Sequence, residues 1–167
     1  GSNLIYAVFQ NAGKSYNAGV EMTFSLDVAK WYSFNVNGNV YYNQINAFSV
    51  ENKYPILHTF SADEQSIYSG NAKLNNTFHF KKDIDVQLVA VYLAPDIIPQ
   101  GKIDSRFSLD LGIKKKIQKG KGEIFLNTTD LLNTMVIRKQ IQGDGFSYFS
   151  KDYYETQVVR VGYNYKL

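Results

Sequence analysis

Alternation of apolar and polar residues is the feature that most constrains this sequence. It is clearest in residues 32–43, where aromatic and aliphatic side chains alternate with asparagine and serine. The apolar positions are Tyr32, Phe34, Val36, Val40 and Tyr42, and the polar positions are Ser33, Asn35, Asn37, Asn39 and Asn43, with Tyr41 as the exception. Successive side chains of a strand point to opposite faces of a sheet, so this period predicts strands with one apolar face.

The same pattern recurs along most of the chain, and no capped helical pattern interrupts it. Several of the expected strands exceed the usual length of about 5–6 residues, and about 9–11 residues are enough to cross a bilayer at a tilt. We therefore expect an all-β, antiparallel up-and-down meander of about eight long strands of the outer-membrane β-barrel type. The expected strands are residues 4–10, 15–29, 32–47, 66–81, 84–94, 104–118, 122–141 and 152–167.

The connections between these strands alternate in length. Tight turns are expected at 29–31, 81–83 and 119–122, and long links at 48–65, 95–103 and 142–151. Membrane barrels have short periplasmic turns and long extracellular loops, so this order predicts a periplasmic C-terminus. The link at 11–14 does not fit, because it is short where a long one is expected.

The chemistry of the two faces favours lipid over a soluble core. The apolar face is nearly free of charge, whereas the other face consists of Asn, Ser, Thr and Gly with scattered charges. Aromatic residues gather at strand ends, as the girdles of membrane barrels do. They include Trp31-Tyr32, Tyr41-Tyr42, Phe78, Phe80, Tyr163 and Tyr165. We expect a protein of the bacterial outer membrane in contact with lipid, and a soluble lipocalin-like barrel remains the alternative.

Composition excludes several other classes. The 167 residues carry a net charge of +3 without a basic stripe, so no nucleic-acid partner is expected. The lysine cluster at 114–121 is interpreted as a solvated hairpin end. There is no cysteine, which excludes disulfides, and no apolar run reaches the ~20 residues of a membrane helix. Gly1-Ser2 looks like a cloning scar, and we expect residues 3–167 to be a β-barrel segment whose native N-terminal part is missing.

Three stretches resemble the C-terminal barrel region of TonB-dependent outer membrane receptors of the Bacteroidetes type. The first is Tyr16-Asn17-Ala18-Gly19-Val20-Glu21, similar to a Y-x-x-G-V-E strand opening. The second is Asn127-Thr128-Thr129-Asp130-Leu131-Leu132-Asn133-Thr134, similar to a box on the penultimate strand, with Leu132 in place of the commoner Phe. The third, Arg160 to Leu167, fits the outer-membrane assembly signal but ends in Leu in place of Phe.

The resemblance implies the wall of a receptor that imports a siderophore, a glycan or a similar nutrient. A barrel of about 22 strands would contain this piece as roughly its last third. The implied partners are the barrel assembly machinery and, in the full-length parent, a plug domain and TonB. The implied residues are Arg160, Gly162, Tyr165 and Leu167 in the assembly signal, and Asn127, Asp130, Leu131, Leu132 and Asn133 in the family box.

No enzyme, metal or cofactor is expected. His58 and His79 are too far apart in the sequence for a ready metal pair. His79 with Ser66 or Ser69 and with Glu21 or Asp27 could be drawn as a hydrolase triad, but no local motif fixes that geometry. Acidic residues at 63–64 are expected in a solvated loop, and Gly143-Asp144-Gly145 in a turn.

A cluster of aromatic residues in the last long link provides candidates for ligand contact. Aromatic rings on an outer loop can stack on a sugar or a siderophore. Packing among loops or in the interface belt is the favoured alternative. The candidates are Phe146, Tyr148, Phe149 and Tyr153, with Tyr154 beside them.

The sequence leaves three questions open. It does not name the transported substrate. The chain is interpreted either as a receptor fragment, which alone would transport nothing, or as a complete small eight-stranded outer-membrane protein of structural or adhesive role. The open edges of a fragment would close into a small barrel or pair with a second copy.

Overall fold

The computed structural model describes residues 11, 13–53, 57–143 and 145–166, and these form an antiparallel all-β structure. A single 3₁₀ turn, η1 (Gln118–Gly120), accompanies the strands in these ranges. The described residues contain no helix that is long and apolar enough to span a membrane. The strands are β1 (Ser15–Ala29), β2 (Tyr32–Ile45), β3 (Phe48–Asn52), β4 (His58–Ala62), β5 (Gln65–Phe80), β6 (Ile84–Leu93), β7 (Asp96–Ile98), β8 (Gly101–Ile103), β9 (Arg106–Ile117), β10 (Gly122–Thr129), β11 (Ile137–Gly143), β12 (Phe146–Asp152) and β13 (Val158–Tyr165).

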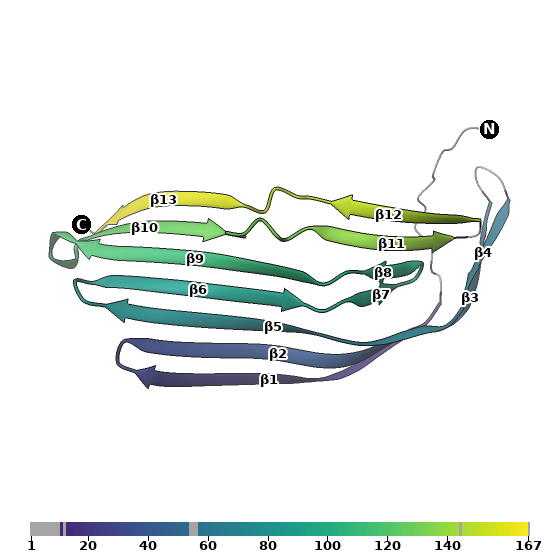
Figure 1. Ribbon diagram of the computed structural model, residues 1–167, viewed down its shortest axis with the longest axis horizontal. Helices are drawn as coiled ribbons and strands as arrows, with labels where there is room; N and C mark the ends of the chain where they lie inside the picture. The colour runs from purple at the N-terminus through teal and green to yellow at the C-terminus, as the bar shows by residue number, and fades with distance from the viewer. Residues whose placement is uncertain (1–10, 12, 54–56, 144, 167) are drawn as a thin grey trace.

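A seven-stranded main sheet dominates the structure, with the order β1-β2-β5-β6-β9-β10-β13 (Figure 1). Every neighbouring pair is antiparallel, so the expected meander is confirmed. The three tight turns lie at one end, beside the C-terminus, and the long connections lie at the other. Two long strands, β1 and β13, form the opposite edges of this open sheet. The expected strand at 4–10 lies outside the described residues.

The long connections contain strands, which corrects the expectation of simple links. β3 and β4 form a hairpin within 48–65, and β7 and β8 form one within 95–103. The expected strand at 122–141 is wrong as a single element, because residues 130–136 separate β10 from β11. Likewise, the link expected at 142–151 belongs to the β11–β12 hairpin, and the last strand begins at Val158, not at residue 152.

A second sheet continues four strands of the main sheet beyond the level of the break at residues 130–136. Its order is β12-β11-β8-β7, which matches the order β13-β10-β9-β6 of the strands that precede or follow them in the chain. Figure 1 shows the two sheets end to end, with β7, β8, β11 and β12 on the side of the long connections. The long connections are therefore an ordered extension of the wall.

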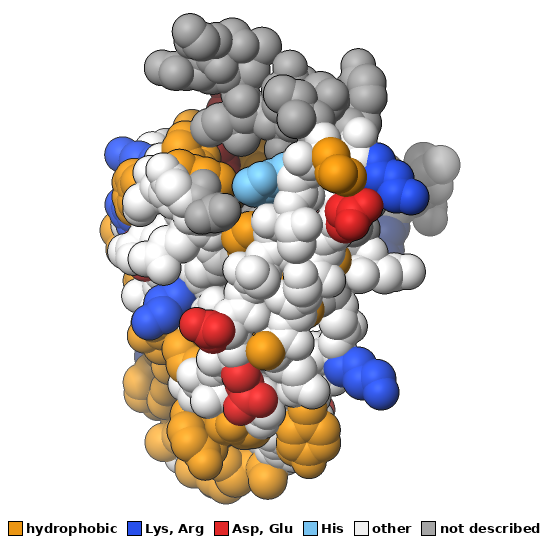
Figure 2. All heavy atoms as spheres, turned by 90° about the vertical axis from the view of Figure 1, so that its right-hand side faces the viewer, with side chains coloured by type: hydrophobic (Ala, Val, Ile, Leu, Met, Phe, Trp, Pro, Cys, Tyr) orange, Lys and Arg blue, Asp and Glu red, His pale blue; other side chains and the backbone are white. Residues whose placement is uncertain are grey.

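Strand register places most of the apolar residues of the seven long strands on one face, and Val89, Val91 and Phe125 are among the exceptions. Val36 lies opposite Phe24 on β1 and Leu74 on β5, and Leu88 lies opposite Leu111. The opposite face gathers Asn35, Asn37, Asn75 and other polar residues, and Tyr41 lies on it with them. In Figure 2, viewed from the end of the long connections, hydrophobic side chains gather along one margin while polar side chains and backbone cover the middle.

The apolar face of the main sheet is exposed and not packed against a core. Val20 and Met22 are 66% and 67% exposed, and none of Phe34, Val36, Leu109 and Leu111 is buried. The buried hydrophobic side chains in the described ranges are Phe60 on β4 and Ile97 on β7, both outside the main sheet. Soluble monomers rarely expose such a continuous apolar surface, so this face needs an apolar environment.

Aromatic rings form two bands across the apolar face. Near the short turns, Phe78 stacks on Tyr32 with ring centroids 4.9 Å apart and lies 6.1 Å from Phe80. Towards the long connections, the ring centroids of Tyr42 and Tyr68 lie 5.2 Å apart. Tyr68 and Phe78 are ten residues apart on β5, which is about 33 Å along a strand. At a tilt of about 40° the bands are about 25 Å apart, the height of the apolar belt of a membrane barrel.

A charge placed on the apolar face midway between the bands should destabilise the protein far more than one on the polar face. Val36→Arg turns a charge towards the expected hydrocarbon and should lower the free energy of unfolding by about 2–4 kcal/mol. Asn37→Arg, its neighbour on β2, turns the same charge to the polar side and should cost less than about 1 kcal/mol. Urea unfolding in lipid vesicles measures the unfolding free energy of both variants. Equal losses would contradict this orientation of the sheet.

Candidate functional site

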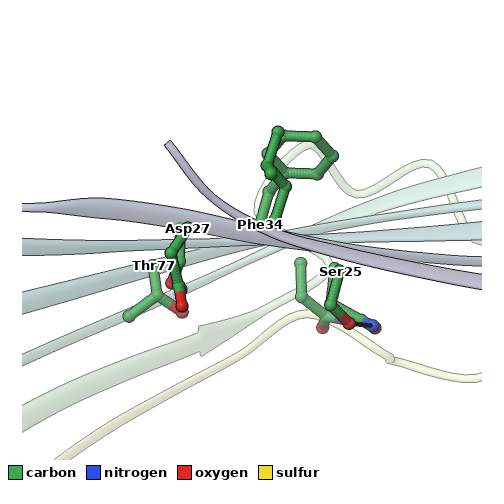
Figure 3. A pocket seen from close by; sticks show the side chains of 8 residues that line it. Ser25, Asp27, Phe34 and Thr77 are labelled. Atoms are coloured by element: carbon green, nitrogen blue, oxygen red, sulfur yellow. Dashed lines mark hydrogen bonds between the residues drawn. The ribbon is translucent and has the colours of Figure 1, made fainter. Parts of the chain in front are cut away.

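The polar face of the main sheet carries an extended hydrogen-bonded lining. The side-chain amide Nδ2 of Asn35 donates to Ser25 Oγ at 2.7 Å, and Thr23 Oγ1 donates to Asn37 Oδ1 at 3.0 Å. A shallow pocket opens here between β1, β2 and β5. Figure 3 shows Ser25, Asp27 and Thr77 projecting to the pocket side of the sheet, whereas Phe34 projects to the other side. Apart from Asp27, this lining offers uncharged donors and acceptors to a passing solute.

A larger hollow on the same face contains charged groups near the short turns. His79 Nδ1 lies 2.6 Å from Asp85 Oδ1, and Lys114 Nζ lies 3.6 Å from Asp85 Oδ2. Glu123, Asn127 and other residues of β9, β10 and β13 complete the lining. The tight turn at 81–83 creates this cluster, because it places His79 directly opposite Asp85. Asp85 was not singled out from the sequence, although the turn and the antiparallel pairing together could have indicated it.

The candidate hydrolase triad does not assemble. Ser69 and Ser66 precede His79 on the same strand by ten residues or more, about 33 Å or more along β5. Glu21 and Asp27 lie on β1, two strands away, and the carboxylate that contacts His79 is Asp85. Among the residues that the structure describes, no group of three His, Cys, Asp or Glu side chains could hold a metal ion.

The acidic pair and the glycine turn occupy connections. Asp63 and Glu64 are exposed between β4 and β5, as expected for a solvated loop. Gly143 ends β11 and Gly145 follows at a positive φ of 76°, between two paired strands, which fits the expected turn. Asp144 lies outside the described residues. His58 begins β4 and is exposed.

The junction between the two sheets is organised by one buried carboxylate, Asp130, which is 2% exposed. Thr156 Oγ1 donates to its Oδ2 at 2.6 Å, and the Met135 amide donates to the same atom at 3.1 Å. The Thr134 amide donates to Oδ1 at 2.9 Å. The Asp130 amide in turn donates to Asp110 Oδ1 at 2.8 Å. These bonds tie the loop after β10 to the segment before β13 and to β9.

Hydrogen bonding keeps this carboxylate ionised despite its burial. Burial by itself would raise the pKa of the Asp130 carboxyl, but the hydrogen bonds from Thr156, Thr134 and Met135 outweigh it and hold the pKa below its ordinary value. Asp130 lies in the connection between β10 and β11, beyond the long strands of the main sheet. The charged carboxylate thereby joins the loop after β10 to Thr156 in the segment before β13.

The other box residues surround this junction. Asn127 lies on the polar face of β10, opposite Arg160 and Gly112. Leu131 and Leu132 are 38% and 54% exposed, and Asn133 turns the chain at a φ of 54°, its amide donating to Asp130 O at 2.8 Å. The partner Thr156, 26 residues further on, was missed because no local pattern relates it to the box.

A second carboxylate, Asp96, joins the extension to the main sheet. Tyr41 Oη donates to Asp96 Oδ2 at 2.6 Å, and the side-chain amide Nδ2 of Asn43 donates to Asp96 Oδ1 at 2.9 Å. This contact explains why Tyr41 breaks the sequence alternation: its ring lies on the polar face to reach β7. Tyr41 was expected among the aromatic residues at the membrane interfaces. The position of Tyr41 on the polar face corrects that assignment.

The C-terminal strand holds three of the four assembly-signal residues. Arg160 and Gly162 lie on the polar side of β13, and Tyr165 lies on the apolar side, 6.5 Å from Tyr163. Leu167 lies outside the described residues. A β-carbon at Gly162 would collide with the Phe125 ring on β10, so a larger residue there would force that ring to shift. No finding on these residues tests their role in assembly.

The candidate ligand-contacting aromatics lie on one hairpin. Phe146, Tyr148 and Phe149 belong to β12, the edge strand of the second sheet, and are 47%, 45% and 56% exposed. Tyr153 follows β12 and is 46% exposed. Tyr148 lies opposite Ile141, and Phe149 lies opposite Gln140, so the two rings leave opposite faces of the hairpin. Both rings remain available for a ligand, and their binding role stays a prediction.

Comparison with known proteins gives one match. The family model described as outer membrane protein beta-barrel family matches residues 1–165. No curated protein and no solved structure matches the sequence. The family match places the chain in the bacterial outer membrane, an environment that can cover the exposed apolar face with lipid.

Removing the charge of Asp130 should loosen the junction. Asp130→Asn replaces an acceptor oxygen with an amide donor that faces the donors of Thr156 and Met135, so we expect a loss of about 2 kcal/mol in unfolding free energy at neutral pH. The contribution is fully present above the ordinary pKa of 3.8 and is lost as pH falls through the lower folded-state value. The difference between wild type and Asp130→Asn should therefore shrink below about pH 4.

Urea unfolding between pH 3 and pH 8 measures this difference. Asp63→Asn, at an exposed position, removes the same charge and should change stability by less than about 0.5 kcal/mol. A pH-independent difference for Asp130→Asn would contradict the assignment of an ionised, hydrogen-bonded carboxylate.

Proposed function

The chain belongs to the outer membrane protein beta-barrel family, and we propose that it is a wall segment of a TonB-dependent receptor that imports a nutrient. Its place is the bacterial outer membrane. The long strands cross the bilayer with Val20, Val36, Leu109 and their neighbours towards lipid. The polar face lines the lumen, and the second sheet extends outside the membrane.

The open main sheet is the observation that carries this proposal. β1 and β13 each pair with a single strand of the described residues, so one edge of each is unpaired. An open edge cannot persist in hydrocarbon, because its amide and carbonyl groups find no water there. Further strands must cover both edges. A receptor barrel of about 22 strands would supply neighbours on both sides of a seven-stranded piece.

The positions of the three stretches that resemble receptor barrels support the same assignment. The first lies in β1, the second spans the end of β10 and the Asp130 junction, and the third begins at Arg160 within β13. The second stretch forms a loop with a defined structural role, since its Asp130 binds the segment before the last strand. A receptor of this type would present β13 to the barrel assembly machinery during insertion.

In this proposal the chain performs no chemistry on the substrate. TonB would act on a plug domain in the full-length receptor, and the wall would bind, guide and enclose the solute. The amide and hydroxyl groups around Asn35 and Ser25 suit this task, because they hydrogen-bond to polar solutes, and Asp27 is the charged side chain of the same pocket. The fragment by itself is expected to transport nothing.

Energy-dependent uptake by the full-length protein tests the proposal. Cells carrying it should accumulate a labelled siderophore, cobalamin or oligosaccharide, and deletion of TonB should abolish accumulation of the same compound. Cells without the protein provide the baseline. A small eight-stranded barrel of structural or adhesive role would give no accumulation in either background, and uptake that persists without TonB would indicate a passive pore.

The aromatics of β12 should contribute to binding of that substrate. Tyr148→Ala with Phe149→Ala removes two exposed rings on opposite faces of the hairpin, so a bound solute loses the stacking contact of one ring, worth about 1 kcal/mol, and binding should weaken about fivefold. Equilibrium binding of the substrate to cells or to the purified receptor measures this loss of affinity. Tyr68→Ala removes a ring that is 79% exposed on the apolar face and serves as the control. Unchanged affinity in the double variant would remove β12 from the binding surface.

A further inference from the structure

Half of the positive charges of the chain lie at the short-turn end. All three tight turns carry lysine, and the adjoining strand ends add more. We call this group the basic rim. Its members are Lys30, Lys81, Lys82, Lys114, Lys115, Lys116, Lys119, Lys121 and Lys166, nine of the 18 basic residues. The carboxylates at the same end are Asp27, Asp83, Asp85 and Glu123. The rim is therefore strongly positive, and Figure 1 places its turns together beside the C-terminus.

Lys115 differs from the rest of the rim by its position on the apolar face. It lies directly opposite Ile84 on β6 and Ile124 on β10, both of which belong to that face. In the described parts of the seven long strands it is the one charged residue there. Its side chain is exposed, and no ion pair joins it to any described residue.

The two neighbouring lysines on β9 have counter-charges. Lys114 lies 3.6 Å from Asp85 on the polar face, and Lys116 lies opposite Glu123 on the same face. An ammonium group on the lipid side without a carboxylate partner requires an anion from outside the chain, or water, to offset its desolvation.

The depth of Lys115 in the wall matches the headgroup region. Ile84 lies opposite Phe80, and Ile124 lies opposite Tyr163, so Lys115 sits in line with the aromatic band near the short turns. Such bands mark the membrane–water interface. The four-carbon stem of lysine can lie along the apolar face while its ammonium group reaches towards the interface.

We propose that the basic rim binds anionic phospholipid headgroups, and that Lys115 contacts the headgroup phosphate from the lipid side. The ammonium group pairs with the phosphate, the stem lies against acyl chains beside Ile84 and Ile124, and the turn lysines add a surface potential. A lysine without a carboxylate partner strengthens attraction to an anionic surface by about fivefold. This assignment depends on the membrane position of the wall and not on any transported substrate.

Lipid retention by the full-length protein tests the proposal. The protein is reconstituted in nanodiscs of phosphatidylcholine with 20% phosphatidylglycerol, released into mild detergent, and examined by native mass spectrometry for bound lipid. We expect enrichment of phosphatidylglycerol over phosphatidylcholine. Lys115→Gln should reduce this enrichment about fivefold. Lys116→Gln, the same change one residue away on the polar face, should reduce it less than twofold.

Three results would overturn the proposal. They are equal retention of both lipids by the wild type, enrichment that is insensitive to salt, and equal losses in Lys115→Gln and Lys116→Gln. Lys115→Arg keeps the charge and should retain phosphatidylglycerol, so a loss equal to that of Lys115→Gln would trace the effect to packing and contradict the assignment. The salt dependence of the wild type needs no variant and decides the matter if Lys115→Gln does not fold.

Discussion

Alternate side chains of each strand point in opposite directions, and the structure depends on keeping this alternation in phase across seven strands. Antiparallel pairing sets Phe24, Val36, Leu74 and Leu111 on one surface and the asparagines of β2 and β5 on the other. A slip of one residue in any pair would turn polar side chains to lipid. The main sheet needs no core of its own, because hydrocarbon takes the place of one.

In this proposal the second sheet and the β3–β4 hairpin lie beyond the membrane and follow the rules of a soluble protein. Their strands are short, and the buried hydrophobic side chains of the described residues belong to them, Ile97 to the second sheet and Phe60 to the hairpin. Two carboxylates hold the second sheet to the wall, Asp130 through the loop after β10 and Asp96 through Tyr41 and Asn43. The change from lipid to water along the strands is thus accompanied by a change from exposed apolar surface to buried polar junctions.

Sequence patterns predicted the elements whose structure is set by local alternation. The long strands β1, β2, β5, β6 and β9 and the three tight turns were located within a few residues. The division of residues 122–141 was not predicted, since alternation continues on both sides of the break and the positive φ of Asp130 leaves no periodic signal. Contacts between distant segments, such as Asp130 with Thr156, depend on strand order and lie beyond a single-sequence pattern.

The orientation of the sheet can be measured directly in lipid, because this chain contains no cysteine and accepts single labels. Spin labels at positions 34, 36, 109 and 111 would be compared with labels at 35, 37 and 110 for collisions with oxygen, which dissolves in lipid, and with a water-soluble nickel chelate. The first set should favour oxygen and the second the chelate, strand by strand. Labels at 34, 36, 109 and 111 that were shielded from both reagents would mean that these residues form a protein core, and would contradict the account.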